Sequence, residues 1–290
     1  MDYISVKARA KINLTLDVTG KRPDGYHELR MIMQTVELYD KVFVKKIEKP
    51  VIKIKTNLEW LPTDNRNLAY KAAEVIKERY DIPGGVFIEL KKTIPVAAGL
   101  AGGSADCAAV LYAMNILYNL KIKREELAAI ALELGSDVPY CLMRGTALAE
   151  GRGEILTRLP ACPEAWIVLA KPAVGMSTAA VYKAIDAIDG YAHPDTEGMI
   201  DAIKKSDINA VASKLSNVLE NASIPMCPMI GDIKKMLSDM GAVGVLMSGS
   251  GRQPMAYSRI RKQHRKRQTM SKRRLTYEMF IQQKFSIYKD

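Results

Sequence analysis

The sequence predicts an α+β protein built from two lobes. Two kinds of segment support this class, short ones with alternating apolar residues and longer ones with apolar stripes at helical spacing, and both recur in each half of the chain. Of the 290 residues, 48% are hydrophobic, so the chain can bury a sizeable core. No run of about 18 uncharged apolar residues occurs, so no membrane span is expected.

The first lobe is expected to cover residues 1–160. Residues 3–18 are interpreted as a strand, a turn and a second strand, and Arg22-Pro23-Asp24-Gly25 has the composition of a tight turn. The pattern predicts further strands at 36–47, 51–54 and 86–90, helices at 67–80, 104–117 and 124–134, and a hairpin within 146–156.

The second lobe is expected to cover residues 161–251, after a proline-rich boundary at 160–163. The pattern predicts strands at 166–171 and 243–247, and helices at 177–186, 207–219 and 228–240. Residues 252–290 do not continue this organisation and form a separate basic tail.

The cysteines indicate neither a zinc site nor a disulfide framework. Cys107, Cys141, Cys162 and Cys227 are widely separated, and no CxxC pair occurs. The N-terminal segment lacks the continuous apolar core of a secretory signal. A reducing, cytoplasmic location is therefore expected.

A glycine-rich loop between an expected strand and an expected helix carries the strongest chemical signal. It reads Pro95-Val96-Ala97-Ala98-Gly99-Leu100-Ala101-Gly102-Gly103-Ser104-Ala105. Glycines let backbone N–H groups approach an anion, and a helix N-terminus adds its positive dipole end. The spacing fits neither GxxxxGK[ST] nor GxGxxG. The loop predicts a phosphate site of another type, and a glycine-rich turn without a ligand is the alternative.

This loop resembles the central ATP-binding motif of the GHMP kinases, the superfamily of galactokinase, homoserine kinase, mevalonate kinase and phosphomevalonate kinase. Two further motifs of that superfamily occur in the right order, Ala8-Arg9-Ala10-Lys11-Ile12-Asn13-Leu14 and Ser248-Gly249-Ser250-Gly251. The resemblance implies an N-lobe like domain 2 of ribosomal protein S5, a ferredoxin-like C-lobe, and ATP and Mg²⁺ as cofactors.

Two more segments are similar to those of the diphosphocytidyl-methylerythritol kinases within this superfamily. They are Arg22-Pro23-Asp24-Gly25-Tyr26-His27-Glu28-Leu29 and Gly135-Ser136-Asp137-Val138-Pro139. The resemblance implies ATP-dependent phosphorylation of the 2-hydroxyl of a cytidyl diphosphate substrate in the non-mevalonate isoprenoid pathway. A homoserine or mevalonate kinase is the nearest alternative enzyme, and the Asp24–His27 segment speaks against it.

The resemblance assigns the chemistry to Asp137 as general base and Lys11 as the cation beside it. Phosphoryl transfer needs positioning and charge neutralisation, and a base must reach the acceptor hydroxyl. Without the resemblance, Asp137 is a helix-capping residue before a proline turn, and Lys11 is a surface lysine on a strand. Asn13 lies on the same face as Lys11 and is a substrate contact or simply a polar strand residue.

The substrate is expected to meet Tyr26, His27, Tyr182 and the Ser248–Gly251 turn. Tyr26 and His27 follow the tight turn, where a tyrosine ring can stack on a cytosine and a histidine can bond its polar edge. Tyr182 is a second aromatic candidate, although its spacing with Val181 and Ile185 also fits core packing. Ser104 is a weak candidate for Mg²⁺. The protein is expected to act as a monomer or a homodimer.

The tail accounts for nearly all the net charge of +11. Residues 252–290 contain twelve Lys/Arg and two Asp/Glu, so the rest of the chain has a net charge of +1. A nucleic-acid-binding protein acting through this tail is the alternative from another class, and we consider it the weaker one. A solvated, disordered tail is a second interpretation.

We favour a third interpretation, a one-nucleotide frameshift after Gly251. Read one base earlier, the codons of residues 255–258 give Gly, then Leu, Ile or Val, and then Phe or Leu if Ser258 uses a TCN codon. With suitable codons the hidden frame spells Pro-Thr-Thr-Tyr-Gly-Val-Phe, the strand that the family has here. The shift predicts a second lobe that lacks an edge strand and a covering helix.

Overall fold

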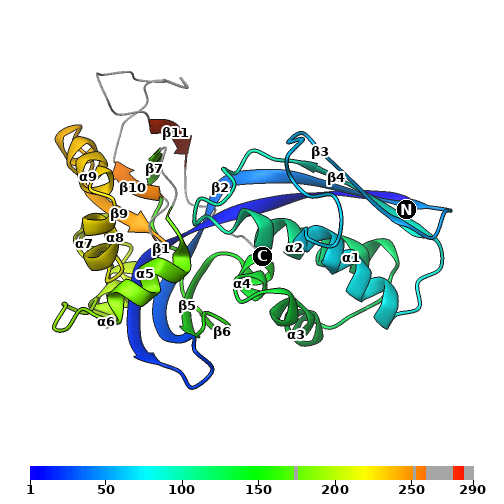
Figure 1. Ribbon diagram of the computed structural model, residues 1–290, viewed down its shortest axis with the longest axis horizontal. Coiled ribbons are helices and arrows are strands. Elements are labelled where there is room, and N and C mark those ends of the chain that lie inside the picture. Colours follow the sequence, from blue (N-terminus) through cyan, green and yellow to red (C-terminus); the bar gives the residue numbers. More distant parts are fainter. Residues whose placement is uncertain (173–175, 251–252, 259–276, 284–290) are drawn as a thin grey trace. The chain divides into compact units, whose positions relative to one another are not determined.

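Groups of strands and groups of helices follow one another along the chain in the computed structural model, which describes residues 1–172, 176–250, 253–258 and 277–283 (Figure 1). The predicted α+β class is confirmed. The chain divides into unit 1 (1–11, 38–97 and 101–144) and unit 2 (12–37, 98–100 and 145 onward). This division differs from the expected boundary near residue 160, because two long strands contribute residues to both units.

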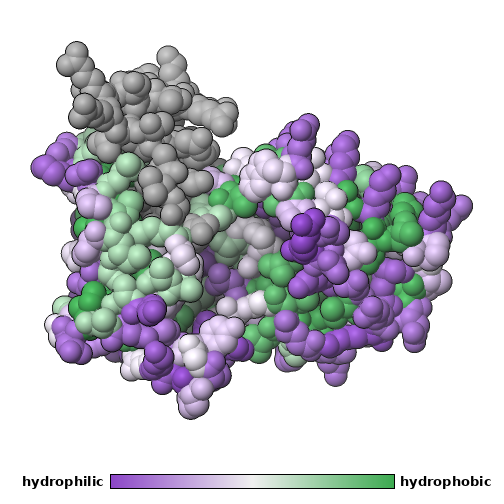
Figure 2. Space-filling view, viewed as in Figure 1, coloured by the Kyte–Doolittle hydropathy of each residue, from purple (hydrophilic) through white to green (hydrophobic). Residues whose placement is uncertain are grey.

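Unit 1 consists of strands and four helices. Strand β3 (Ile52–Thr56) pairs in parallel with β4 (Gly85–Lys91), which pairs antiparallel with the later part of β2 (His27–Ile47). The helices are α1 (Leu68–Arg79), α2 (Gly102–Leu117), α3 (Arg124–Leu134) and α4 (Val138–Met143). Figure 1 shows the helices on one side of β3 and β4, and Figure 2 shows hydrophilic side chains over much of this unit's visible surface.

Local sequence explains where these helices begin. Asn67 caps α1 by accepting the N–H of Ala69 at 3.0 Å. Ten of the 16 residues of α2 are buried, so its sequence is apolar around most of the helix instead of along one stripe. Helix α4 was not expected, because Gly135 and Pro139 indicate a break. Pro139 lies in the first turn, where its missing N–H costs nothing.

Unit 2 contains two sets of paired strands. Strand β1 (Tyr3–Lys21) pairs with the short β8 (Ser216–Asn217), and β2 pairs with β5 (Thr146–Gly151) of the β5–β6 hairpin, whose second strand is Ile155–Arg158. A four-stranded sheet has the order β11 (Tyr277–Gln283), β7 (Trp166–Pro172), β10 (Gln253–Ser258), β9 (Gly244–Ser248). The helices of unit 2 are α5 (Thr178–Ile185), α6 (Thr196–Lys204), α7 (Ile208–Ser213), α8 (Glu220–Met226) and α9 (Met229–Asp239).

Helix α9 packs on this four-stranded sheet. Ile233 and Leu237, one turn apart on α9, form a core cluster with Val168 and Ala170 of β7. The helix ends at Asp239, and Gly241, which follows its C-cap Met240, has a φ of +88° in the region that favours glycine. Ser248 is the last residue of β9, the strand at one edge of this sheet, so the packed sheet supports the turn that follows it.

Several expected elements differ from the observed ones. Residues 3–21 form one continuous strand, so the turn expected within 3–18 is wrong, and β2 begins at His27 instead of 36. The helix expected at 207–219 ends at Ser213 and is followed by β8 and α8. Helices α6 and α8 were not expected. Within the described part of the chain, no helix has the length and apolarity that a membrane span requires.

The tail contributes two strands. β10 pairs antiparallel with β7 and β9, and β11 pairs antiparallel with β7. The prediction that the altered tail removes an edge strand is therefore wrong for the described residues. Backbone pairing needs only extended geometry and free N–H and C=O groups, which explains how an atypical sequence can complete a sheet.

Candidate active site

Lys11 and Asp137 come together in unit 1. Lys11 lies on β1 with its side chain 7% exposed, and its Nζ is 3.8 Å from Oδ1 of Asp137, whose side chain is 35% exposed. Asp137 precedes α4, but its carboxylate forms no capping hydrogen bond to that helix. Asp137 occupies the N-cap position of α4 without a side-chain capping bond, and the surface alternative for Lys11 is wrong. The pair presents a partly accessible carboxylate beside a buried cation.

The glycine-rich loop has an unusual backbone. Three of its residues have positive φ: Ala97 at 57°, Gly99 at 73° and Ala101 at 55°. An alanine in this conformation costs about 1–2 kcal/mol, so two of them indicate a loop held in shape by its surroundings. Ala101 is also the N-cap of α2 and has no side chain that could cap it. The first N–H groups of α2 are thus left for an anion.

Gly99 also meets the Ser248–Gly249 turn within unit 2. A Cβ on Gly99 would lie 3.1 Å from the carbonyl oxygen of Ser248, and Gly249 has a φ of +64°. The amide of Asn217 donates to the carbonyl groups of Met247 (2.8 Å) and Gly249 (2.9 Å) and so supports the turn. Sequence reasoning missed Asn217, because a single buried amide has no pattern.

The polar side chains around this turn are only partly available. Ser248 is fully buried, and its hydroxyl accepts the backbone N–H of Asn13 at 3.3 Å. The side chain of Asn13 is buried too, with Nδ2 3.2 Å from the sulfur of Met31. The hydroxyl of Ser250 lies 2.8 Å from that of Thr178, at an exposed position. Gly251 lies outside the described residues.

An aromatic cluster lies elsewhere in unit 2. The rings of His27 and Tyr182 are 4.8 Å apart and inclined by 32°. On α5 the buried residues are Val181 and Ile185, whereas Tyr182 is half-buried, and its role toward the substrate stays a prediction. His27 also bonds to Asp186 through Nε2 at 2.6 Å. Sequence reasoning missed Asp186, because its partner is 159 residues away.

Tyr26, which precedes His27 in the sequence, is exposed. Its exposed fraction is 59%, and the guanidinium of Arg152 lies 5.1 Å from the centre of its ring. A cation over a tyrosine ring is attracted by the ring's electron-rich face. Tyr26 thus has one ring face occupied by Arg152, which the sequence did not indicate.

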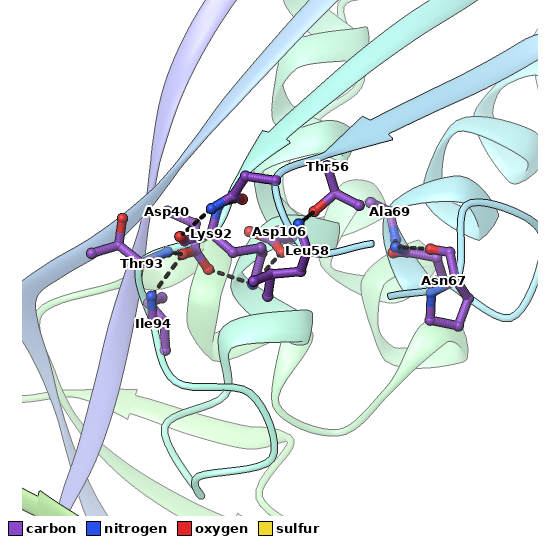
Figure 3. A network of polar contacts seen from close by, with 11 residues as sticks. Asp40, Thr56, Leu58, Asn67, Ala69, Lys92, Thr93, Ile94 and Asp106 are labelled. Atoms are coloured by element: carbon purple, nitrogen blue, oxygen red, sulfur yellow. Dashed lines mark hydrogen bonds and ion pairs between the residues drawn. The ribbon is translucent and has the colours of Figure 1, made fainter. Parts of the chain in front are cut away.

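A buried network of three charged side chains was also missed (Figure 3). The ammonium of Lys92 bonds to Oδ2 of Asp40 and, at 2.6 Å, to Oδ2 of Asp106. All three side chains are at most 3% exposed. The other oxygen of Asp40 accepts the N–H groups of Thr93 and Ile94, whereas Oδ1 of Asp106 has no partner.

Burial sets the titration of this network. It raises the pKa of Asp106 to about 7, although Lys92 opposes the shift. Burial alone would lower the pKa of Lys92, but Asp106 and Asp40 raise it overall, so the lysine stays charged. Lys92 directly follows β4 and precedes the glycine-rich loop, and Asp106 is in the first turns of α2, so the network ties the start of the loop to its helix. The sequence signal that could have indicated this network is Asp106, a single acidic residue in an otherwise apolar helix.

The described residues contain no dedicated metal site. No group of three or more His, Cys, Asp or Glu side chains among them is arranged to hold an ion. The four cysteines are buried, free thiols. Ser104 is half-buried in the first turn of α2, and its role toward Mg²⁺ stays a prediction.

Known families match both parts of the chain. The model of the GHMP kinases N terminal domain matches residues 67–145, and that of the GHMP kinases C terminal domain matches residues 199–272. A 4-diphosphocytidyl-2-C-methyl-D-erythritol kinase of Lachnospira eligens is 52% identical over 251 residues, covering 87% of each chain. The protein of the same name from Bacillus subtilis is 49% identical over 245 residues, covering 84% of each.

Solved structures agree with these matches. A crystal structure of 4-(cytidine 5'-diphospho)-2C-methyl-D-erythritol kinase has a TM-score of 0.77 at 34% identity, covering 88% of this chain and 90% of that one. A homoserine kinase from Cytophaga hutchinsonii shares the fold with a TM-score of 0.70 at 22% identity, covering 89% and 85%. The fold expected from the three motifs is confirmed, and the chain belongs to the 4-diphosphocytidyl-2-C-methyl-D-erythritol kinases within the GHMP kinases.

Proposed function

We propose that this protein transfers the terminal phosphoryl group of ATP to the 2-hydroxyl of 4-diphosphocytidyl-2-C-methyl-D-erythritol, in the non-mevalonate isoprenoid pathway. Relatives of that name are about half identical to this chain over most of its length, which supports the substrate. The observation that carries the chemistry is the pair of Lys11 and Asp137, because the carboxylate has no capping bond and is partly accessible.

Asp137 is the proposed base. Its carboxylate takes the proton of the 2-hydroxyl as that oxygen bonds to the γ-phosphorus. The bond from the γ-phosphorus to the β,γ-bridging oxygen breaks, and ADP leaves with its electron pair. Lys11, whose Nζ lies 3.8 Å from Oδ1 of Asp137, stabilises the negative charge that develops on the attacking oxygen.

The glycine-rich loop, residues 95–105, is the proposed ATP site. The backbone N–H groups of this loop, together with the uncapped start of α2, suit the phosphate oxygens. Mg²⁺ would arrive as the counter-ion of ATP and supply charge neutralisation, with Ser104 as the candidate protein contact. The chain's own contribution is to hold the triphosphate still.

The substrate is assigned to side chains of unit 2. Tyr182 and His27 form the aromatic edge that suits a cytosine ring, with Tyr26 as a further stacking candidate. Asn13 and residues 248–251 are assigned to the diphosphate and the sugar alcohol.

A coupled ADP-release assay with the cytidyl substrate tests this function. Asp137→Asn removes the base but keeps the shape, so kcat should fall about 10²–10⁴-fold while the KM for ATP stays within about twofold. Asp189→Asn, at an exposed carboxylate of unit 2, is the matched control and should leave kcat unchanged.

Two outcomes would contradict the proposal. Turnover of homoserine or mevalonate, without turnover of the cytidyl substrate, would assign the chain to a sibling activity. Salt-sensitive RNA binding that disappears on deletion of residues 252–290, with no ATP consumption, would support the nucleic-acid alternative.

A further inference from the structure

The hydrogen bonds of His27 are set by a carboxylate to which no role has been assigned. Nε2 of His27 lies 2.6 Å from Oδ1 of Asp186, and the other oxygen of Asp186 accepts the ammonium of Lys21 at 2.6 Å. Both oxygens of Asp186 are thus occupied by specific partners. These two hydrogen bonds lower the pKa of Asp186, that from Lys21 more than that from His27, so the group is ionised at neutral pH.

A single face of α5 contacts the imidazole twice. Tyr182 and Asp186 are four residues apart, so they lie on the same face of the helix. Tyr182 stacks against the ring, and Asp186 bonds its Nε2 edge. The side chain of His27 is only 10% exposed, so the ring has little freedom to turn over. The contacts from α5 therefore fix both the orientation of the His27 ring and the nitrogen that carries its proton.

An ionised carboxylate accepts hydrogen bonds only, so Nε2 of His27 must carry a proton. In a neutral imidazole the other nitrogen, Nδ1, then has a lone pair and accepts. The described residues supply no hydrogen bond to Nδ1. A ligand that bonds to Nδ1 must offer a donor at that point.

We propose that Asp186 is a specificity-determining positioning residue, which makes Nδ1 of His27 an acceptor and so selects a cytosine base over a uracil base. The exocyclic 4-amino group of cytosine donates a hydrogen bond, whereas the 4-oxo group of uracil only accepts. Stacking on Tyr182 does not separate the two bases, since each offers a π-face. This inference depends on the proposed cytidyl substrate and adds the residue that enforces it.

The first test compares bases. kcat and KM are measured for the cytidyl substrate and its uridyl analogue at saturating ATP, using the full chain, Asp186→Ala and the control Asp189→Ala. Asp186→Ala should raise the KM for the cytidyl substrate about 10–100-fold, with kcat within about twofold, and should lower the preference for cytosine by a similar factor. Asp189 is an exposed carboxylate three residues further on, so its variant matches the charge change.

The second test determines by NMR which ring nitrogen of His27 carries the proton, and it does not require enzyme turnover. The chain has three histidines, so the ¹⁵N NMR signals of His27 can be assigned by comparison with His27→Gln. At pH 7.5 the full chain should show a protonated Nε2 and an unprotonated Nδ1, and Asp186→Ala should show a mixture. Asp186→Glu, which keeps the carboxylate, should restore the single tautomer.

The outcomes distinguish failure of the proposed role of Asp186 from failure of the proposed kinase function. An imidazolium with both nitrogens protonated at pH 7.5, or equal base preference in Asp186→Ala and Asp189→Ala, would overturn the inference. Absence of turnover with either base in the full chain would instead refute the proposed function, while the tautomer of His27 would still test the role of Asp186.

Discussion

Replacing Lys92 with methionine tests whether the buried network holds unit 1 together. Methionine keeps the apolar stem and removes the ammonium. Asp40 would retain the N–H groups of Thr93 and Ile94, but Asp106 would lose the partner of its Oδ2, and its Oδ1 already has none. The variant therefore leaves a buried carboxylate without compensation, and Asp106 should take up a proton.

The expected loss is large compared with the stability of a folded protein. Removing one partner of a buried ion pair costs about 3–5 kcal/mol. Proteins have total stabilities of about 5–15 kcal/mol, so the variant should lose about a fifth or more of the free energy of unfolding. At about 2–4 °C per kcal/mol for a chain of this size, Tm should fall by roughly 6–20 °C.

Urea unfolding and calorimetry measure the effect, with Lys55→Met as the matched control. Lys55 pairs with Glu89 at 3.4 Å, but their side chains are 68% and 45% exposed, and such pairs contribute about 0.2–1 kcal/mol. Hydrogen exchange should show lost protection in α2 for Lys92→Met alone. If Lys92→Met and Lys55→Met lose equal stability, the network does not hold the loop and helix together.

Three further predictions concern the same chain. Asp106 has a pKa of about 7 in the folded state and 3.8 in the unfolded state, so the free energy of unfolding falls as pH rises from about 4 to 7. The free energy of unfolding of Asp106→Asn, measured from pH 5 to 8, should lack that fall. Parallel pH curves for the variant and the unchanged chain would contradict the assignment. Gly99→Ala should raise the KM for ATP and lower Tm more than Gly190→Ala, because both have positive φ but only Gly99 has an atom of Ser248 within 3.1 Å. Restoring the hidden frame after residue 251 should raise Tm through a better-packed second lobe, and equal Tm and turnover would contradict a damaged lobe. The frameshift itself is tested by sequencing the gene, and an unshifted frame in related isolates would remove it.

Local signals determined much of this protein. The cap at Asn67, the bounds of α3 and the turn at 22–25 follow from residues a few positions apart. The glycine-rich loop was identified from its own composition, and the family motifs singled out Lys11 and Asp137. These signals work because caps, turns and helix dipoles act over one or two turns of chain.

Only the tertiary structure decided how distant polar groups pair. Asp40 and Lys92 are 52 residues apart, and His27 and Asp186 are 159 apart, so no local pattern could join them. It also decided that residues 3–21 run as one strand and that tail residues complete a sheet, since strand pairing depends on the neighbour available. Motifs therefore named the reacting groups, whereas the contacts that orient and charge them came from the fold, because a buried charge is stable only where the folded chain supplies its partner.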